Sequence, residues 1–233
     1  MATPNEPMPF FAIRDGYALY RGPVAGAGPV HRHAAFQIAI AIRGQLAMVD
    51  SSGVRHEATT LVVSPMTPHR ISAVTELLTY FVEPQCVFAD RLRAHHVAGI
   101  APAPELNNLE ERDIGPSGGG PSAELDPRVL AALSALRDGS VPLSGLAGSL
   151  GVSPQRLRGL ARRDLGMPLA RWRVWSRLRI AAEELQAGRS PAEAAATAGF
   201  ADQAHFTRQL REMMGVTPAA VLPMVRGQFL RAR

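Results

Sequence analysis

The sequence predicts a protein of two halves, with an antiparallel β half followed by an all-α half. In the first half, short runs rich in Val, Ile, Thr, Tyr and Phe are separated by turn-prone Gly, Pro, Asp and Ser. In the second half, two similar helix pairs occupy the region from Leu143 to Pro223. Charge divides in the same way, because residues 125–233 hold 16 Arg against 8 acidic residues, and residues 1–124 hold 9 against 12. A chain of 233 residues has room for two domains of ordinary size.

Five β-like runs make up most of the first half. They are residues 18–20, 36–42, 46–49, 60–63 and 77–82. Their spacing is typical of a small antiparallel barrel or sandwich. After Val87 the apolar pattern changes to the helical spacing of Phe88 and Leu92. The Gly- and Pro-rich segment at 115–124 then predicts a flexible linker between the two halves.

In the first helix pair, each helix has an apolar face and is followed by a glycine. Its first helix carries Leu143, Leu146, Ala147 and Leu150 at spacings of three and four, and its second carries Leu157, Leu160, Ala161 and Leu165. Gly151 suits the tight turn between the helices. Ser153 and Pro154 supply an N-cap followed by proline at the first helical position, and Gly166 ends the second helix.

The second helix pair repeats this pattern. Ala195 stands four residues before Gly199, as Ala147 stands four residues before Gly151. Asp202 is the expected N-cap of the last helix of the pair. Between the two pairs, residues 169–187 contain no Gly or Pro and carry an apolar stripe, which predicts one connecting helix with its two Trp residues in the core.

Residues 126–224 resemble the DNA-binding domain of AraC/XylS-type bacterial transcription regulators. The resemblance rests on Ala-Gly-Phe-Ala-Asp-Gln-Ala-His-Phe-Thr-Arg at 198–208, followed by Gly-Val-Thr-Pro at 215–218. It implies an AraC-type domain at 125–233 with helix-turn-helix units at about 141–166 and 189–215. It also implies that the second helix of each unit, over 153–164 and 202–213, enters the major groove of double-stranded DNA.

Polar and small residues on these two helices are the candidate DNA contacts. They are Ser153, Gln155, Arg156, Arg158, Gly159, Arg162, Arg163, Asp202, Gln203, His205, Thr207, Arg208 and Arg211. We expect Arg158 and Arg208 to reach base edges and Arg162 and Arg163 to contact phosphates. The alternative for Arg162 and Arg163 is that they form an ordinary solvated face. Gly159 is unusual within a helix, so either the backbone approaches DNA closely there or the position tolerates glycine.

The β half resembles a cupin, which implies a cupin-like β-barrel at 1–114. His31-Arg-His33 with Gln37 and Gly44 resembles the first cupin motif, and the segment ending at His69 resembles a shortened second motif. Gln37 stands where metal-binding cupins usually have Glu, and an amide is a poor metal ligand. We therefore expect no metal or other cofactor, although His31, His33 and His69 are the candidate ligands should a metal bind.

Alternation along 36–42 separates a bulky face from a small one. Phe36, Ile38 and Ile40 share one side of the strand, while Gln37 and Ala39 share the other. A barrel that holds a ligand needs space inside, so the small face should point inward. The predicted effector-binding residues are His31, His33, Gln37, Ala39 and His69.

These observations predict a cytoplasmic transcription regulator whose partners are double-stranded DNA and a small-molecule effector. RNA polymerase and a second copy of the chain are further candidate partners, whereas membrane association and enzymatic activity are not expected. The single cysteine and the absence of a secretory signal or membrane-length apolar run fit the cytoplasm. Two alternatives stay open: a metal-dependent cupin enzyme fused to a DNA-binding module, and a β domain that serves only for dimerisation.

Overall fold

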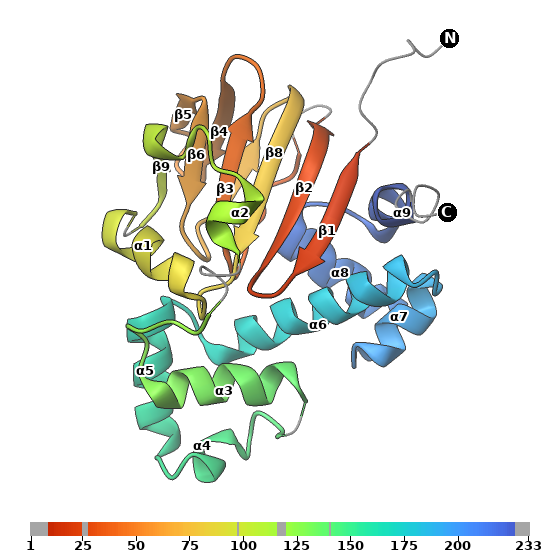
Figure 1. Cartoon of the computed structure of the whole chain (residues 1–233). Coiled ribbons are helices and arrows are strands. Elements are labelled where there is room, and N and C mark those ends of the chain that lie inside the picture. Colours follow the sequence, from red (N-terminus) through yellow and green to blue (C-terminus); the bar gives the residue numbers. More distant parts are fainter. Residues whose placement is uncertain (1–8, 25–27, 97, 116–119, 140, 227–233) are drawn as a thin grey trace.

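The computed structural model describes residues 9–24, 28–96, 98–115, 120–139 and 141–226. The β half lies on one side of the molecule and the helical half on the other (Figure 1). Helix α6 (Leu169–Gln186) runs along the boundary between the two halves, with the β-sheets on one side and α3 (Pro127–Arg137) on the other. Within these described ranges, no helix is long and apolar enough to cross a bilayer.

The described part of the β half forms two antiparallel sheets. The larger has the order β1 (Phe10–Arg14), β2 (Tyr17–Val24), β8 (Val74–Val82), β3 (Phe36–Ala41), β6 (Thr60–Val63) and β9 (Ile100–Pro102). The smaller has the order β5 (Arg55–Ala58), β4 (Leu46–Asp50) and β7 (His69–Ile71).

The sheets do not close into the barrel that the cupin resemblance implied. No strand ladder joins them among the described residues. An isolated bridge between His31 and His69 links β7 to the chain before β3. Closure would require strand pairing along both edges of the larger sheet. The smaller sheet has only three strands of three to five residues, which offer too few backbone hydrogen-bonding partners for this. The structure is therefore a pair of packed sheets, and β1 at the open edge contacts α9 (Pro218–Arg226).

Strand β3 divides its side chains between two apolar clusters. Phe36, Ile38 and Ile40 pack in one cluster with the residues of α1 (Val87–His95) on the outside of the larger sheet. Ala39 and Ala41 lie in another cluster, between the two sheets, with residues of β4 and β6. The bulky face thus points outward and the small face inward. Two short helical segments, η1 (Pro104–Leu106) and α2 (Glu111–Ile114), complete the β half.

The helical half follows the predicted order closely. The remaining helices are α4 (Leu146–Ser149), α5 (Pro154–Leu165), α7 (Pro191–Thr197) and α8 (Gln203–Met214). The Ser153 hydroxyl accepts a hydrogen bond from the backbone N–H of Arg156, and the Asp202 carboxylate accepts one from that of His205, so both are N-caps. Helix α4 is shorter than the apolar run from Leu143 to Leu150 suggested.

Both tryptophans of the chain lie in α6 and belong to the core. Trp172 is fully buried, and its indole N–H donates to the backbone carbonyl of Leu133 in α3 at 3.2 Å. Trp175 is also buried and faces the β half, where its indole N–H donates to Glu83. Helix α6 therefore belongs to the cores of both halves.

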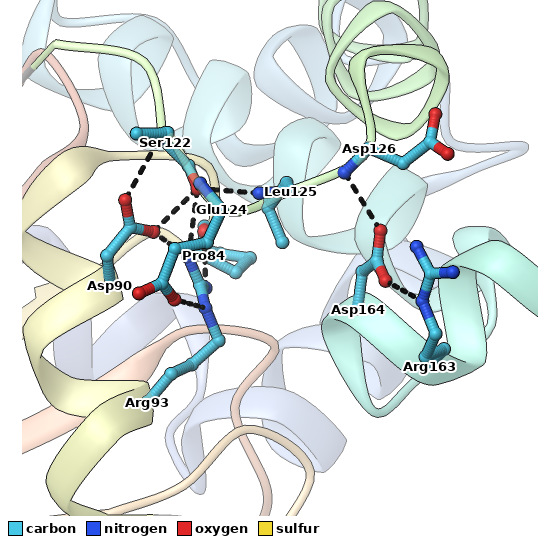
Figure 2. A network of polar contacts seen from close by, with 10 residues as sticks. Pro84, Asp90, Arg93, Ser122, Glu124, Leu125, Asp126, Arg163 and Asp164 are labelled. Atoms are coloured by element: carbon cyan, nitrogen blue, oxygen red, sulfur yellow. Dashed lines mark hydrogen bonds and ion pairs between the residues drawn. The ribbon is translucent and has the colours of Figure 1, made fainter.

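The segment expected to be a linker is fixed to the β half where it is described. Residues 116–119 lie outside the described residues, but Ser122 is buried against α1, where its hydroxyl donates to the Asp90 carboxylate at 2.6 Å (Figure 2). The backbone N–H of Ala123 donates to the same carboxylate at 2.9 Å. Four residues after Ser122, the backbone N–H of Asp126 donates to Asp164 at the end of α5. The chain thus passes from an anchor on α1 to an anchor on α5 within a few residues.

Candidate DNA-binding surface and interdomain cavity

Helix α5 presents one apolar and one polar face. Leu157, Leu160, Ala161 and Leu165 are buried against the rest of the helical half. The other predicted contact residues of this helix, namely Gln155, Arg156, Arg158, Gly159, Arg162 and Arg163, are all exposed. Arg163 forms an ion pair with the adjacent Asp164, whereas no ion pair of Arg156, Arg158 or Arg162 is found within the described part of the chain.

Helix α8 also has one apolar and one polar face, but fewer of its polar side chains are fully exposed. Phe206, Leu210 and Met213 are buried, and Gln203, Arg208 and Arg211 are exposed. Asp202, the N-cap, is exposed as well, whereas the last two predicted contact residues are only half-exposed: the His205 ring packs against Phe200, and the Thr207 hydroxyl donates to the backbone carbonyl of Gln203 at 2.8 Å.

The two helices match position by position. Each has twelve residues between its N-cap and a glycine in the left-handed conformation, Gly166 with φ 68° and Gly215 with φ 69°. In this alignment Arg211 occupies the position of Arg162, and Arg208 occupies the position of Gly159. A Cβ built on Gly159 meets no atom within 4 Å, so no contact inside the protein requires glycine at this place.

A cavity of about 580 Å³ lies between the sheets and the helical half. The β half lines it with Phe11, Tyr20, His33, Gln37, Thr79 and Phe81, among others. The helical half lines it with Trp175, Leu178, Arg179, Leu210, Met214 and Val221, among others. Most of these side chains are apolar, and the volume is in the range of ordinary small-molecule sites. Since Leu210 and Met214 belong to α8, a molecule in this cavity would touch a candidate DNA-contacting helix.

The predicted effector-binding residues divide into two groups. His31, His33 and Gln37 line the cavity, as expected for a ligand site. Ala39 and His69 do not. Ala39 is fully buried in the apolar cluster between the sheets, and His69 is fully buried behind Gln37, whose amide lies 2.8 Å from its Nε2.

Three buried histidines meet beside this cavity. Each of His31, His33 and His69 offers one ring nitrogen, and these nitrogens lie within 4.8 Å of one another. Burial lowers the pKa of His69 to about 4 and also lowers the pKa of His31. Nδ1 of His31 faces the Pro29 carbonyl and Nδ1 of His69 faces the Thr67 carbonyl, both at 2.9 Å. Neutral imidazoles so held are able to bind either a metal ion or a hydrogen-bonding ligand.

Two sets of polar contacts fasten the halves together next to the cavity. Glu83, at the end of β8, is 2% exposed and accepts from Arg137 of α3 at 2.6 Å and from Arg179 of α6 at 3.1 Å. Glu212 of α8 accepts from Arg32 at 3.0 Å and from Arg171 at 2.6 Å. The β half thus contacts both α6 and α8 directly.

Comparison with known proteins agrees with this geometry. Residues 146–223 match a family model described as a helix-turn-helix domain. The chain carries an AraC-type helix-turn-helix domain. The match begins in α4 and ends in α9, so it contains both helix pairs and α6. No curated protein matches the sequence.

Solved structures share the fold beyond the AraC-type domain. ToxT from Vibrio cholerae O395 is 12% identical, with a TM-score of 0.61, over 92% of this chain and 100% of that chain. Unsaturated fatty acid bound ToxT from strain SCE256 is 13% identical, with a TM-score of 0.59, over 92% and 99%. ToxT O395 bound to (E)-4-(8-methylnaphthalen-1-yl)but-3-enoic acid is 11% identical, with a TM-score of 0.58, over 90% and 99%. At these identities the likeness concerns the arrangement of a β half and a helical half.

Proposed function

We propose that this protein is a sequence-specific transcription regulator in which α5 and α8 enter two adjacent major-groove segments of DNA. The observation that carries this proposal is the pair of matched, capped helices with exposed arginines, which α6 joins within an AraC-type domain. The domain at 125–233 supplies the affinity for phosphates through its excess of arginine. Arg158 and Arg208 then read bases, while Arg162 and Arg163 hold the backbone.

A small molecule in the interdomain cavity controls DNA binding in this proposal. The lining of the cavity by both halves supports it, since a bound molecule changes the contacts of α6 and α8 with residues 1–114. Structures of ToxT carry an unsaturated fatty acid or a naphthalenyl-butenoic acid, which supports ligand control in proteins of this fold. The protein acts in the cytoplasm, with RNA polymerase and a second copy of the chain as further partners, and catalyses no reaction.

Footprinting on the operator tests the DNA part of this proposal. A rigid linker helix should hold α5 and α8 on one face of the duplex, with protected segments about 10 bp, or roughly 34 Å, apart. Arg158→Ala should weaken protection of one segment and Arg208→Ala that of the other. Arg112→Ala, which removes an exposed arginine of the β half, is the matched control and should change neither. Protection of a single segment would contradict the proposal.

The control by a ligand has its own test. Binding of a cavity ligand to the full chain should change operator affinity, because the ligand touches both halves. A ligand that fills the cavity and leaves operator affinity unchanged would favour the alternative in which the β half serves only for dimerisation.

A further inference from the structure

The charged side chains that line the cavity already neutralise one another. Arg179 uses all three guanidinium nitrogens: Nε donates to Glu183 at 3.3 Å, Nη1 to Glu83 at 3.1 Å and Nη2 to the Arg14 carbonyl at 2.7 Å. Glu83 in turn accepts from Arg137, Arg179 and Trp175. Among the described lining residues these two carry the formal charges, so a charged ligand finds no unpaired counter-ion there.

Two buried polar side chains in the same lining have no hydrogen-bond partner. His33 is 3% exposed and neither of its ring nitrogens is bonded, and Thr79 is 1% exposed with an unbonded hydroxyl. The His33 ring packs on Phe81 at 4.8 Å between centroids. Phe81 lies two residues after Thr79 on β8, so their side chains share one face of the larger sheet. Because His33 packs on Phe81, the His33 ring and the Thr79 hydroxyl lie on the same side of that sheet and line the cavity together. A buried polar group without a partner is unfavourable, so each is a place where a ligand gains a hydrogen bond.

The environment of His33 favours the neutral form of its ring. Burial, with the neighbouring His31 and His69, holds its pKa well below the usual 6.5. The Met213 backbone and the Gln37 side chain lie close enough to oppose this fall, although neither contact has the geometry of a full hydrogen bond to a ring nitrogen. A neutral imidazole offers one donor and one acceptor, and therefore complements a hydroxyl or carbonyl group.

We infer that the cavity binds an uncharged, largely apolar molecule whose hydroxyl or carbonyl groups hydrogen-bond to His33 and Thr79. This inference rests on the proposed ligand control and specifies its chemistry. Phe11, Tyr20, Phe81 and Trp175 add aromatic surface to the lining, which favours a flat, ring-containing body. The ligands bound in the ToxT structures are carboxylic acids, so this chain differs from those proteins in the ligand class that it selects.

A matched pair of fluorescent probes tests the charge preference on the full chain at pH 7.5. The probes are 1-pyrenemethanol and 1-pyrenecarboxylate, which share one ring system and differ in charge. Energy transfer from tryptophan to pyrene reports binding, because Trp175 lines the cavity. The alcohol should bind at least about tenfold more tightly than the acid, since a buried carboxylate without a counter-ion is strongly unfavourable. A second pair, 1-decanol and decanoate, repeats the comparison through displacement of the pyrene alcohol or a shift of the unfolding temperature.

Three variants test the assigned contacts. Thr79→Val and His33→Phe should each weaken binding of the alcohol roughly five- to tenfold, which is the usual effect of one lost hydrogen bond. Ser176→Ala is the matched control, because it removes another buried, unbonded hydroxyl that does not line the cavity, and it should leave binding unchanged. Thr79→Val preserves side-chain shape, so it decides the question should His33→Phe fail to fold.

Each contrary result has a distinct meaning. Equal or tighter binding of the two acids overturns the inferred ligand class while leaving ligand control and DNA binding in place. Normal binding of the alcohol to both Thr79→Val and His33→Phe overturns the contacts. Binding that appears only after Mn²⁺ or Zn²⁺ is added shows that His31, His33 and His69 hold a metal and also overturns the inference. Failure of all four probes overturns both the ligand class and the cavity's role, but footprinting of the operator still tests DNA binding separately.

Discussion

Replacing Glu83 with Gln should loosen the two halves from each other. The substitution keeps the size of the side chain and removes the negative charge that Arg137 and Arg179 share. The new amide NH₂ group also points a donor at guanidinium groups that are themselves donors. Helices α3 and α6 therefore lose their shared attachment to the end of β8.

The expected loss follows from the burial of the partners. Removing one member of a fully buried ion pair costs about 3–5 kcal/mol. Here the side chain of Arg179 is 18% exposed and that of Arg137 is 33% exposed. Arg179 also keeps Glu183 and the Arg14 carbonyl as partners. We therefore expect the free energy of unfolding to fall by about 2–3 kcal/mol, at or just below the lower end of the range for buried pairs.

Urea unfolding followed by tryptophan fluorescence measures this loss. Both tryptophans of the chain lie in α6, and the Trp175 indole donates to Glu83 itself, so the signal reports the interface directly. With a urea dependence of about 3 kcal/mol per M, the midpoint should fall by roughly 1 M. Circular dichroism should show that the variant remains folded without urea, because domains usually have about 5–15 kcal/mol of stability.

Glu212→Gln is the matched control. Glu212 also joins the two halves, through Arg32, and pairs with Arg171 within the helical half, but its side chain is 35% exposed and those of Arg32 and Arg171 are similarly accessible. Solvent screens such pairs, so this substitution should cost about 1 kcal/mol or less. The reasoning is refuted if Glu83→Gln costs less than Glu212→Gln, or if both leave the midpoint unchanged.

Three further predictions concern the DNA-binding helices and pH. Arg158→Ala should cost about 1–3 kcal/mol of operator binding free energy and relax the sequence preference, whereas Arg162→Ala should weaken binding to all DNA sequences alike and flatten its salt dependence. Equal losses of specific and non-specific binding in titrations of Arg158→Ala would exclude a base contact by Arg158. Gly159→Ala should raise the free energy of unfolding by about 1 kcal/mol and lower operator affinity. The control is Gly148→Ala in α4, which changes another exposed glycine without neighbours and should leave operator affinity intact. Unchanged affinity in both variants would mean that α5 does not approach DNA closely at Gly159. Burial, and then the neighbouring His31, lower the pKa of His69 to about 4 in the folded protein. As pH drops from about 6.5 toward 4, the unfolded chain therefore binds a proton at His69 before the folded protein does, and urea midpoints should fall. A flat pH profile would contradict this.

The helical half could be predicted closely because its signals are local. A capping side chain, a proline and a left-handed glycine act within a few residues, so Ser153 and Gly166 mark α5 wherever the rest of the chain lies. The length of α6 follows in the same way from an apolar stripe without breakers. Helix α4 came out shorter than its apolar run, since apolar spacing alone does not fix where a helix begins.

The candidate site could be predicted only in part. Alternation in β3 correctly separated Gln37 and Ala39 from Ile38, because a strand's two faces follow from the sequence. Alternation does not say where along the inner face a cavity lies, and Ala39 falls in the packed region instead. The contributions of Trp175 and Glu83 depend on how the two halves meet, which no local pattern encodes. Closure of the sheets was also beyond the sequence, since it depends on long-range strand pairing.

The anchoring of Ser122 on α1 changes how much freedom the two halves can have. A ten-residue Gly-rich tether would let the halves drift apart by tens of ångströms and meet again by diffusion. With Ser122 held by Asp90 and Asp126 held by Asp164, the segment between the two anchors shrinks to little more than Glu124 and the buried Leu125. The effective concentration of one half near the other then stays very high even when the cavity contacts break. Under the proposed ligand control, we therefore expect the response to be a rotation about this pivot, and mutations that lengthen the short tether should weaken the response without touching either binding site.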